Sequence, residues 1–160
     1  MDPLKNRKAS SFIFLLIFLC HGCIPDTLVD YNTSVPDNHW LYSKSAKVTF
    51  DVKDTQNTYD ISFKIRNTND YRYANLYVLM HLKGPSFSKN LRHQLLLART
   101  SGQWTGKGSG DLFSNSFLLL KHFRFPKAGI YTLEVEQNMR DNPLYGVSDI
   151  GLLIEKSKKP

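Results

Sequence analysis

The sequence predicts an all-β domain, an antiparallel β-sandwich of about seven to eight strands with an immunoglobulin-like or jelly-roll-like arrangement. Several segments alternate apolar and polar residues with a period of two, which is typical of strands with one face in the core and one in water. Turn residues separate these segments at fairly regular spacing. No long stretch shows the 3.6-residue period of a helix, and 95–97 is the one place where a short helix competes.

The clearest alternation lies in residues 59–66. Ile61 and Phe63 are expected to face the core, while Ser62 and Lys64 are expected to face solvent. The same reasoning places further strands at 47–53, 74–82, 92–100, 116–125, 130–137 and 150–154. Turn chemistry between the strands is expected at 54–57, 83–85, 106–110 and 126–129.

The N-terminus has the features of a lipoprotein signal peptide. Residues 5–8 carry three basic side chains, and 12–19 form an unbroken apolar run. That run is about half of the ~20 residues that a membrane-spanning helix needs. Gly22 supplies the small residue that signal peptidase requires before the cut, and Cys23 supplies the thiol to be acylated, for example with palmitate. Plain secretion and an uncleaved anchor are the alternatives.

The domain organisation predicted from the sequence has three parts: a signal peptide over 1–22, a lipidated N-terminus and leader over 23–45, and the β-sandwich domain over 46–160. The leader is polar and contains prolines, although the size of its aromatic residues indicates that its second half packs on the domain. An acidic run after Cys23 would favour export to the cell surface. Its absence favours an outer-membrane lipoprotein that faces the periplasm.

The charge pattern argues against a nucleic-acid partner. The formal net charge is +7, but Lys and Arg are spread along the chain apart from a tail at 156–159. Nucleic-acid binding favours a clustered basic stripe. A solvated basic face near anionic membrane components fits this distribution better.

No motif predicts catalysis, a cofactor or a metal site. The glycine-rich loop Trp104–Asp111 lacks the spacing of a P-loop and is expected to be a turn between strands. The five histidines show no metal-binding spacing, and no G-x-S-x-G elbow occurs. Cys20 and Cys23 form C-x-x-C at the end of the apolar run with no second pair elsewhere, so the domain is expected to fold without a disulfide.

The chain after Cys23 resembles the gliding-motility-associated lipoprotein family GldH along nearly all its length. The motifs that carry the resemblance lie at 30–40, 59–71, 104–111, 139–140, 146–151 and 154–156. They are long and come from several strands. The segment Leu91–Ala98 departs from the family pattern, which more often has an acidic segment there. The resemblance therefore supports no partner contact by this strand.

The resemblance implies a non-enzymatic cell-envelope lipoprotein of Bacteroidota that supports gliding motility and the linked type IX secretion machinery. Its implied partners are the membrane, through acylated Cys23, and other Gld-type lipoproteins or secretion proteins. The alternative is a ligand-binding outer-membrane lipoprotein of carbohydrate type, an argument by fold analogy. A row of exposed Trp and Tyr on one sheet face would favour that alternative, whereas a polar patch at the loop end would favour a scaffold.

Polar and aromatic residues near predicted strand ends are the candidates for partner binding. They are Arg66, Asn67, Asn69, Asp70, Trp104, Met139, Arg140 and Asp141. Each has a structural alternative. The Arg66–Asp70 segment has the composition of a simple turn, Trp104 is expected either to cover the core or to lie exposed as an anchor, and Arg140 is expected either to meet a partner or to cap its own domain.

Overall fold

The computed structural model describes residues 26–158, so Cys23 and the predicted signal peptide lie outside it. The described residues contain strands and one short 3-10 turn, η1, and no α-helix. The elements are β1 (Thr27–Ser34), η1 (Pro36–Asn38), β2 (His39–Trp40), β3 (Ala46–Val52), β4 (Tyr59–Thr68), β5 (Asn75–Gly84), β6 (Phe87–Leu96), β7 (Lys107–Ser109), β8 (Leu112–Phe123), β9 (Gly129–Gln137), β10 (Leu144–Tyr145) and β11 (Val147–Lys156).

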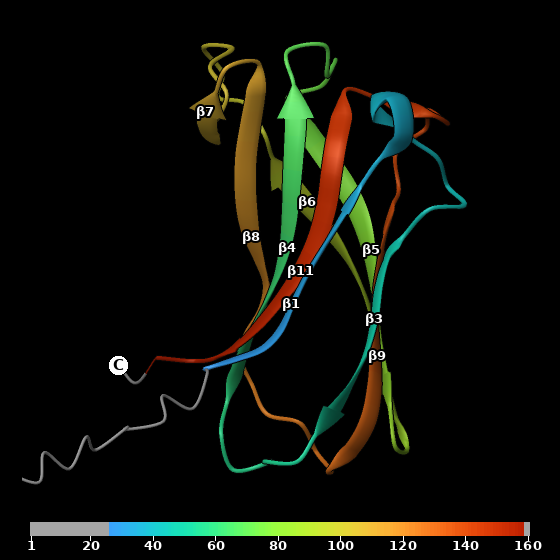
Figure 1. The fold of residues 1–160 in the computed structure, drawn as a ribbon, viewed down its shortest axis with the longest axis vertical. Helices are drawn as coiled ribbons and strands as arrows, with labels where there is room; N and C mark the ends of the chain where they lie inside the picture. The colour runs from blue at the N-terminus through green and yellow to red at the C-terminus, as the bar shows by residue number, and fades with distance from the viewer. Residues whose placement is uncertain (1–25, 159–160) are drawn as a thin grey trace, which may run out of the picture.

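Two sheets pack face to face (Figure 1). One has the strand order β1-β11-β4-β8-β7 and the other β3-β9-β5-β6, while β10 and β2 form a separate two-stranded ribbon. Every pairing is antiparallel. Eight of the strands have seven or more residues. The predicted all-β antiparallel sandwich is therefore confirmed.

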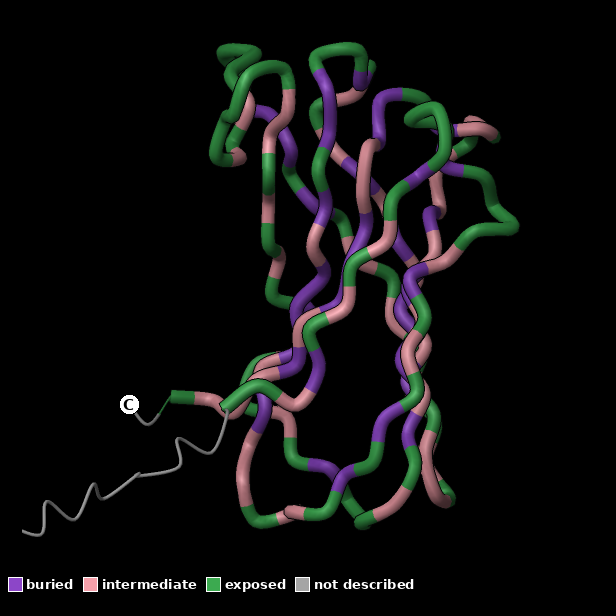
Figure 2. Tube along the Cα trace, in the orientation of Figure 1, coloured by how far each residue is buried: buried purple, intermediate pink, exposed green. Residues whose placement is uncertain are grey.

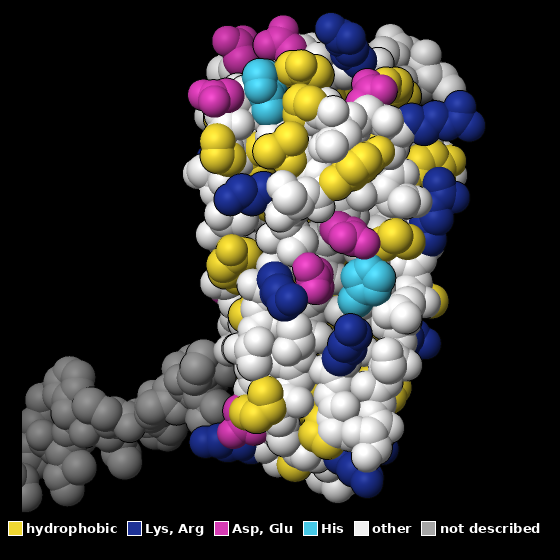
Figure 3. Space-filling view, turned by 90° about the vertical axis from the view of Figure 1, so that its right-hand side faces the viewer, with side chains coloured by type: hydrophobic (Ala, Val, Ile, Leu, Met, Phe, Trp, Pro, Cys, Tyr) yellow, Lys and Arg dark blue, Asp and Glu magenta, His cyan; other side chains and the backbone are white. Residues whose placement is uncertain are grey.

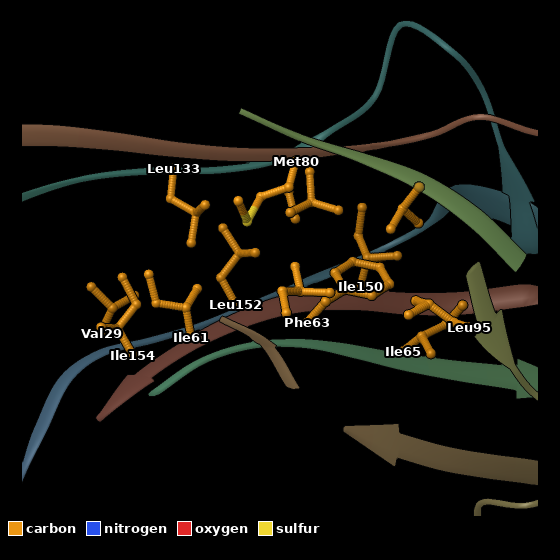
Figure 4. Close-up of a cluster of buried hydrophobic side chains, with 14 of the residues drawn as sticks. Val29, Ile61, Phe63, Ile65, Met80, Leu95, Leu133, Ile150, Leu152 and Ile154 are labelled. Carbon is orange, nitrogen blue, oxygen red and sulfur yellow. The ribbon is translucent and has the colours of Figure 1, made fainter. Parts of the chain in front are cut away.

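The core lies between the sheets, as the alternation of buried and exposed segments along the strands shows (Figure 2). Figure 4 shows Phe63 and Ile61 from β4 beside Leu152 from β11, facing Met80 and Leu133 from the opposite sheet. All five side chains are 0% exposed. The period-two patterns of β4, β5, β9 and β11 thus correspond to real inward faces.

Ser62 departs from its predicted position. It was expected to face solvent, but it is only 9% exposed. Ser62 does lie on the outer face of its sheet, where the strand order places β4 between β11 and β8. Its register partners are Leu153 and Leu118, whose larger side chains cover the hydroxyl-bearing residue from both sides. A small residue on a central strand is therefore buried without belonging to the core.

The segment predicted as a leader is part of the sandwich. β1 pairs with β11 along its whole length, from Thr27 to Ser34, and forms an edge of the five-stranded sheet. Trp40 is 0% exposed and stacks on Phe63 with 6.0 Å between ring centroids. Trp40 in the second half thus packs on the domain as expected, and residues 27–34 of the predicted leader form a strand of its five-stranded sheet. As an edge strand, β1 buries only Val29 deeply, so its apolar pattern is weak.

Two other strands have shifted boundaries. The strand predicted at 92–100 is β6, which begins at Phe87, because its inward positions include polar residues such as Lys89 and His93 that mask the alternation. The strand predicted at 116–125 is β8, which begins at Leu112. The short helix considered at 95–97 does not form.

The expected turns close the hairpins. Pro85 and Ser86 connect β5 to β6, since Gly84 pairs with Phe87. Gly84 is required there because an added Cβ would lie 2.1 Å from the ring of Tyr131. In the glycine-rich loop, Gly110 has a φ of 60° and joins β7 to β8, which confirms a turn between strands.

The two ends of the sandwich differ in what they carry. β1 begins and β11 ends at the lower end in Figure 1, called here the proximal end. The connections that follow β4, β6 and β9 gather at the upper, distal end. Strands of about ten residues separate the two ends by roughly 30 Å. No helix within residues 26–158 is long and apolar enough to cross a membrane.

Candidate functional site

The distal end places Met139–Asp141, one of the two segments that the sequence proposed as a partner surface, against Tyr73, which follows the other segment, Arg66–Asp70. The phenol of Tyr73, which follows β4, donates a hydrogen bond of 2.6 Å to the Asp141 carboxylate, which follows β9. Tyr71 lies beside Tyr73 with 6.0 Å between ring centroids. Residues 68 positions apart in the sequence therefore form one continuous surface, called here the distal cluster and defined by Tyr73, Tyr77, Arg92, Met139, Arg140 and Asp141.

Trp104 borders the distal cluster and is half buried. Its indole Nε1 donates to the Asn69 Oδ1 at 3.2 Å, and its ring packs against Tyr71 and Phe113 at 6.3 and 5.7 Å. Trp104 thus ties the β6–β7 connection to the β4–β5 connection. Of its two expected roles, covering the core describes this geometry better than a free anchor.

Gln137 organises the loop that follows β9, and sequence reasoning did not single it out. Its side chain is 3% exposed, and its amide nitrogen donates to the backbone carbonyls of Trp40 and Asp141 at 3.2 and 3.0 Å. Its amide oxygen accepts from the Met139 backbone N–H at 3.0 Å. A buried amide with three backbone partners holds residues 138–143 in one conformation. The one feature of the sequence that could have pointed to Gln137 is its position at the end of a predicted strand.

Arg92 reaches the distal cluster from β6. Its guanidinium lies over the Tyr77 ring, 4.1 Å from the centroid, and its Nε donates to the Asn138 Oδ1 at 2.8 Å. Arg92 belongs to Leu91–Ala98, the segment for which the resemblance offered no partner contact. The structure therefore adds Arg92 of β6 to the site, although the resemblance to the family gave no reason to include this strand.

The distal cluster encloses a hollow of about 460 Å³, lined by Tyr73, Tyr77, Arg92, Asn138, Met139, Arg140 and Asp141. A second hollow of about 340 Å³ adjoins it and shares Tyr73. Arg72 and Arg99 line this second hollow together with Trp104. The combined surface presents arginines and tyrosines around the half-buried Met139.

Arg140 carries an exposed positive charge on this surface. Its side chain is exposed, and within residues 26–158 it makes no side-chain hydrogen bond or ion pair. Asp141, by contrast, is engaged by Tyr73. Asn69 and Asp70 are exposed at the distal end, and Asn69 is held by Trp104.

Two of the predicted site residues lie in β4 rather than in a turn. Arg66 forms an ion pair with Asp149 of β11, with 2.7 Å between Nη2 and Oδ1. Asn67 is 0% exposed and donates to the Thr68 carbonyl, so it is not available to a partner, and its place among the binding candidates is a correction. Asn67 is buried because β4 extends two residues beyond the predicted end.

The electrostatics of the distal cluster follow from these contacts. The hydrogen bond to Asp141 raises the pKa of Tyr73, since it stabilises the protonated phenol. Burial raises the pKa of Tyr71, whose hydroxyl donates to the Asn75 carbonyl at 2.9 Å. Both phenols therefore remain neutral hydrogen-bond donors at physiological pH.

The rest of the surface has a different character. Figure 3 faces the β3-β9-β5 side and shows charged side chains of both signs across its middle, with hydrophobic side chains gathered toward the upper end. The strands of this sheet carry the Lys47–Glu134 and His81–Glu136 pairs. Among residues 26–158, no group of His, Cys, Asp or Glu is placed to hold a metal ion.

The fold is a β-sandwich domain that carries a cluster of tyrosine and arginine side chains at one end. The sequence profile of the GldH lipoprotein family matches residues 27–154, and the chain belongs to this family. It is thus a lipoprotein by family.

Two relatives are similar over nearly their whole length. A gliding motility lipoprotein GldH homolog from Christiangramia forsetii is 32% identical over 161 aligned positions, which cover 92% of this chain and 96% of the relative. The gliding motility lipoprotein GldH of Flavobacterium johnsoniae is 26% identical, with 93% and 97% covered. No solved structure matches the chain significantly.

Proposed function

We propose that this protein is a non-enzymatic outer-membrane lipoprotein, anchored through acylated Cys23 and facing the periplasm. The distal cluster binds a protein of the gliding motility or type IX secretion machinery, such as another Gld-type lipoprotein, and so supports assembly or stability of that machinery. The observation that carries the proposal is the distal hollow, where Arg92 lies over the Tyr77 ring and Met139 and Arg140 complete the lining.

The direction of the chain supports this orientation. Asp26 begins the described chain at the proximal end, and only two residues separate it from Cys23. With about 3.8 Å between consecutive Cα atoms, Cys23 lies within about 11 Å of Asp26. An anchor there holds the proximal end at the membrane and directs the distal cluster away from it.

The composition of the distal cluster supports a protein partner. Tyr, Met and Arg are the residues enriched at the centres of protein interfaces. Tyr42 and Tyr145, which are 45% and 43% exposed, extend the same aromatic surface. Tyr42 is fixed there by its hydroxyl, which donates to the Met139 carbonyl at 2.7 Å. A partner segment with a carboxylate beside an apolar side chain complements Arg140 and Met139.

The hollow also supports the alternative of a carbohydrate-type ligand, because its volume of about 460 Å³ lies in the range of small-molecule sites. A sugar ring stacks on a free aromatic face. One face of Tyr77 is already covered by the Arg92 guanidinium, and the Tyr73 hydroxyl is engaged by Asp141. These contacts favour the protein partner.

A matched pair of arginine variants tests the proposal. Arg140→Ala removes an exposed guanidinium without a partner in residues 26–158, so we expect an unchanged melting temperature and reduced capture of envelope proteins. Arg66→Ala breaks the ion pair with Asp149, so we expect a lower melting temperature and normal capture. Both variants are expressed in the native host, captured from solubilised envelopes and compared by mass spectrometry.

If folded Arg140→Ala captured envelope proteins normally, Arg140 would be a solvent-exposed residue that takes no part in partner binding. Capture that depends on added oligosaccharide, with no protein retained, would favour the ligand-binding alternative. A loss of folding in Arg140→Ala would contradict the geometry on which the proposal stands, because no hydrogen bond or ion pair in the described residues depends on this side chain.

A further inference from the structure

The proximal end carries a further hollow, separate from the two at the distal end. It has a volume of about 550 Å³ and lies where the β3–β4 connection, the end of β8 and the end of β11 meet. Arg124, Lys156 and Lys158 line it together with His122. Asp26 is the only acidic residue among its lining residues.

The cationic Arg and Lys side chains of this hollow do not form ion pairs within the described part of the domain. Within residues 26–158, Arg124, Lys156 and Lys158 form no ion pair within 4.0 Å. Gln56 and Thr58 add an amide and a hydroxyl to the lining. Clustered cations and neutral hydrogen-bond donors are groups that bind phosphate.

The acids near the hollow are held by internal hydrogen bonds. Asp60 accepts from the His122 backbone N–H at 2.8 Å and from the Ser157 hydroxyl at 2.6 Å. The backbone N–H of Gln56 binds Asp54 at 2.8 Å. Asp54 and Asp60 are thus engaged in hydrogen bonds within the domain, and neither lines the hollow.

We propose that this proximal hollow binds the phosphate of an anionic lipid headgroup in the leaflet that holds the Cys23 acyl chains. The inference rests on the acylation proposed above. Asp26 both lines the hollow and lies within about 11 Å of Cys23. The headgroup layer of a bilayer is roughly 5–8 Å thick on each side, so an acylated Cys23 brings the hollow to the depth of the lipid phosphates. Binding there fixes the tilt of the domain and the direction of the distal cluster.

Lysine acetylation of the acylated full chain tests the proposal. The mass of the purified protein reports the acyl groups beforehand, so failure of the anchor is recognised separately. The protein is reconstituted into vesicles of phosphatidylcholine alone or of equal parts phosphatidylcholine and phosphatidylglycerol. We expect acetylation of Lys156 and Lys158 to slow by about fivefold with phosphatidylglycerol. Lys107, an exposed residue of β7 at the distal end, is expected to react at the same rate in both.

Lys53 distinguishes a site from a general surface field, because it is exposed at the proximal end but does not line the hollow. Arg124→Gln should abolish most of the protection of Lys156 and Lys158, whereas Lys53→Gln should leave it intact. Equal protection of Lys53, Lys156 and Lys158 would overturn the proposal, and so would full protection in Arg124→Gln. Inorganic phosphate added to phosphatidylcholine vesicles should not protect Lys156 and Lys158 from acetylation. If it protected them as well as phosphatidylglycerol does, the hollow would be a site for soluble phosphate instead.

Discussion

The guanidinium of Arg92 lies over the ring of Tyr77, 4.1 Å from its centroid, and joins β6 to β5 at the edge of the distal hollow. Arg92 also binds Asn138, so one side chain connects two strands to the loop after β9. This arrangement presents a rigid, positively charged wall beside Met139 and Arg140. Rigid aromatic and guanidinium groups lose little entropy on binding, which suits them to an interface.

Arg92→Ala is expected to reduce partner capture while costing about 1 kcal/mol or less of folding free energy, because an exposed cation–π contact contributes little to stability. Arg92→Lys keeps the charge but loses the planar contact and the Nε–H donor, so its capture should lie between wild type and Arg92→Ala. Chemical denaturation and envelope capture measure the two effects. If both variants captured partners as well as wild type does, Arg92 would not belong to the partner-binding surface.

Phe63→Ala is expected to lower the free energy of unfolding by about 3–5 kcal/mol, because Phe63 is fully buried and stacks with Trp40. Lys64→Ala provides the neighbouring control. Lys64 forms an ion pair with Asp30 of β1, which is largely exposed, so its loss should cost no more than about 1 kcal/mol. Similar denaturation midpoints for the two variants would refute the assignment of the inward face of β4.

Asp149 is expected to make the stability depend on acid pH. Burial alone would raise its pKa, but hydrogen bonds from Arg66, Ser148 and Ser34 outweigh burial and hold the pKa below the ordinary 3.8. A lowered folded-state pKa contributes stability that is present above the unfolded value and is lost as the pH falls through the folded value.

The unfolding free energy should therefore decline below about pH 4, where the unfolded state takes up the proton first. Asp149→Asn and Arg66→Gln should both flatten this decline relative to wild type. Denaturant titrations between pH 6 and pH 2.5, roughly, measure it. Wild-type pH dependence in both variants would show that the Arg66–Asp149 pair does not contribute.

Cys23 is predicted to carry the acyl chains. In cells labelled with a fatty-acid analogue, Cys23→Ala should lose the label, because its thiol is the acceptor that follows the small residue Gly22. Cys20→Ala is the matched control and should keep the label. Loss of label only in Cys20→Ala would show that Cys20, and not Cys23, is the acylated residue.

The sequence predicts the central strands well because their inward faces are uniformly apolar, as in β4 with Ile61 and Phe63. It misses β1, whose role as an edge strand needs only one deeply buried side chain, Val29. It also predicts the burial of Ser62 wrongly, because cover from neighbouring strands is not visible in one strand's pattern.

The candidate site is predicted in part for a similar reason. Residues near strand ends, such as Met139 and Arg140, can be found in the sequence because turn and loop positions often carry function. Gln137 and Arg92 cannot, since their roles depend on contacts with residues far away in the chain, as between Arg92 and Asn138. Asn67 shows the reverse, a polar residue that suggested a turn and is buried in a longer strand.

The central claim is that the distal cluster meets an envelope protein while the proximal end stays at the membrane. Site-specific photo-crosslinking in intact cells tests it most directly, with the photoreactive residue at position 140 or, as the control, in place of exposed Asp51 of β3. The account predicts a discrete crosslinked protein from position 140 and none from position 51. Crosslinks from position 51 alone, or the same products from both positions, would contradict it.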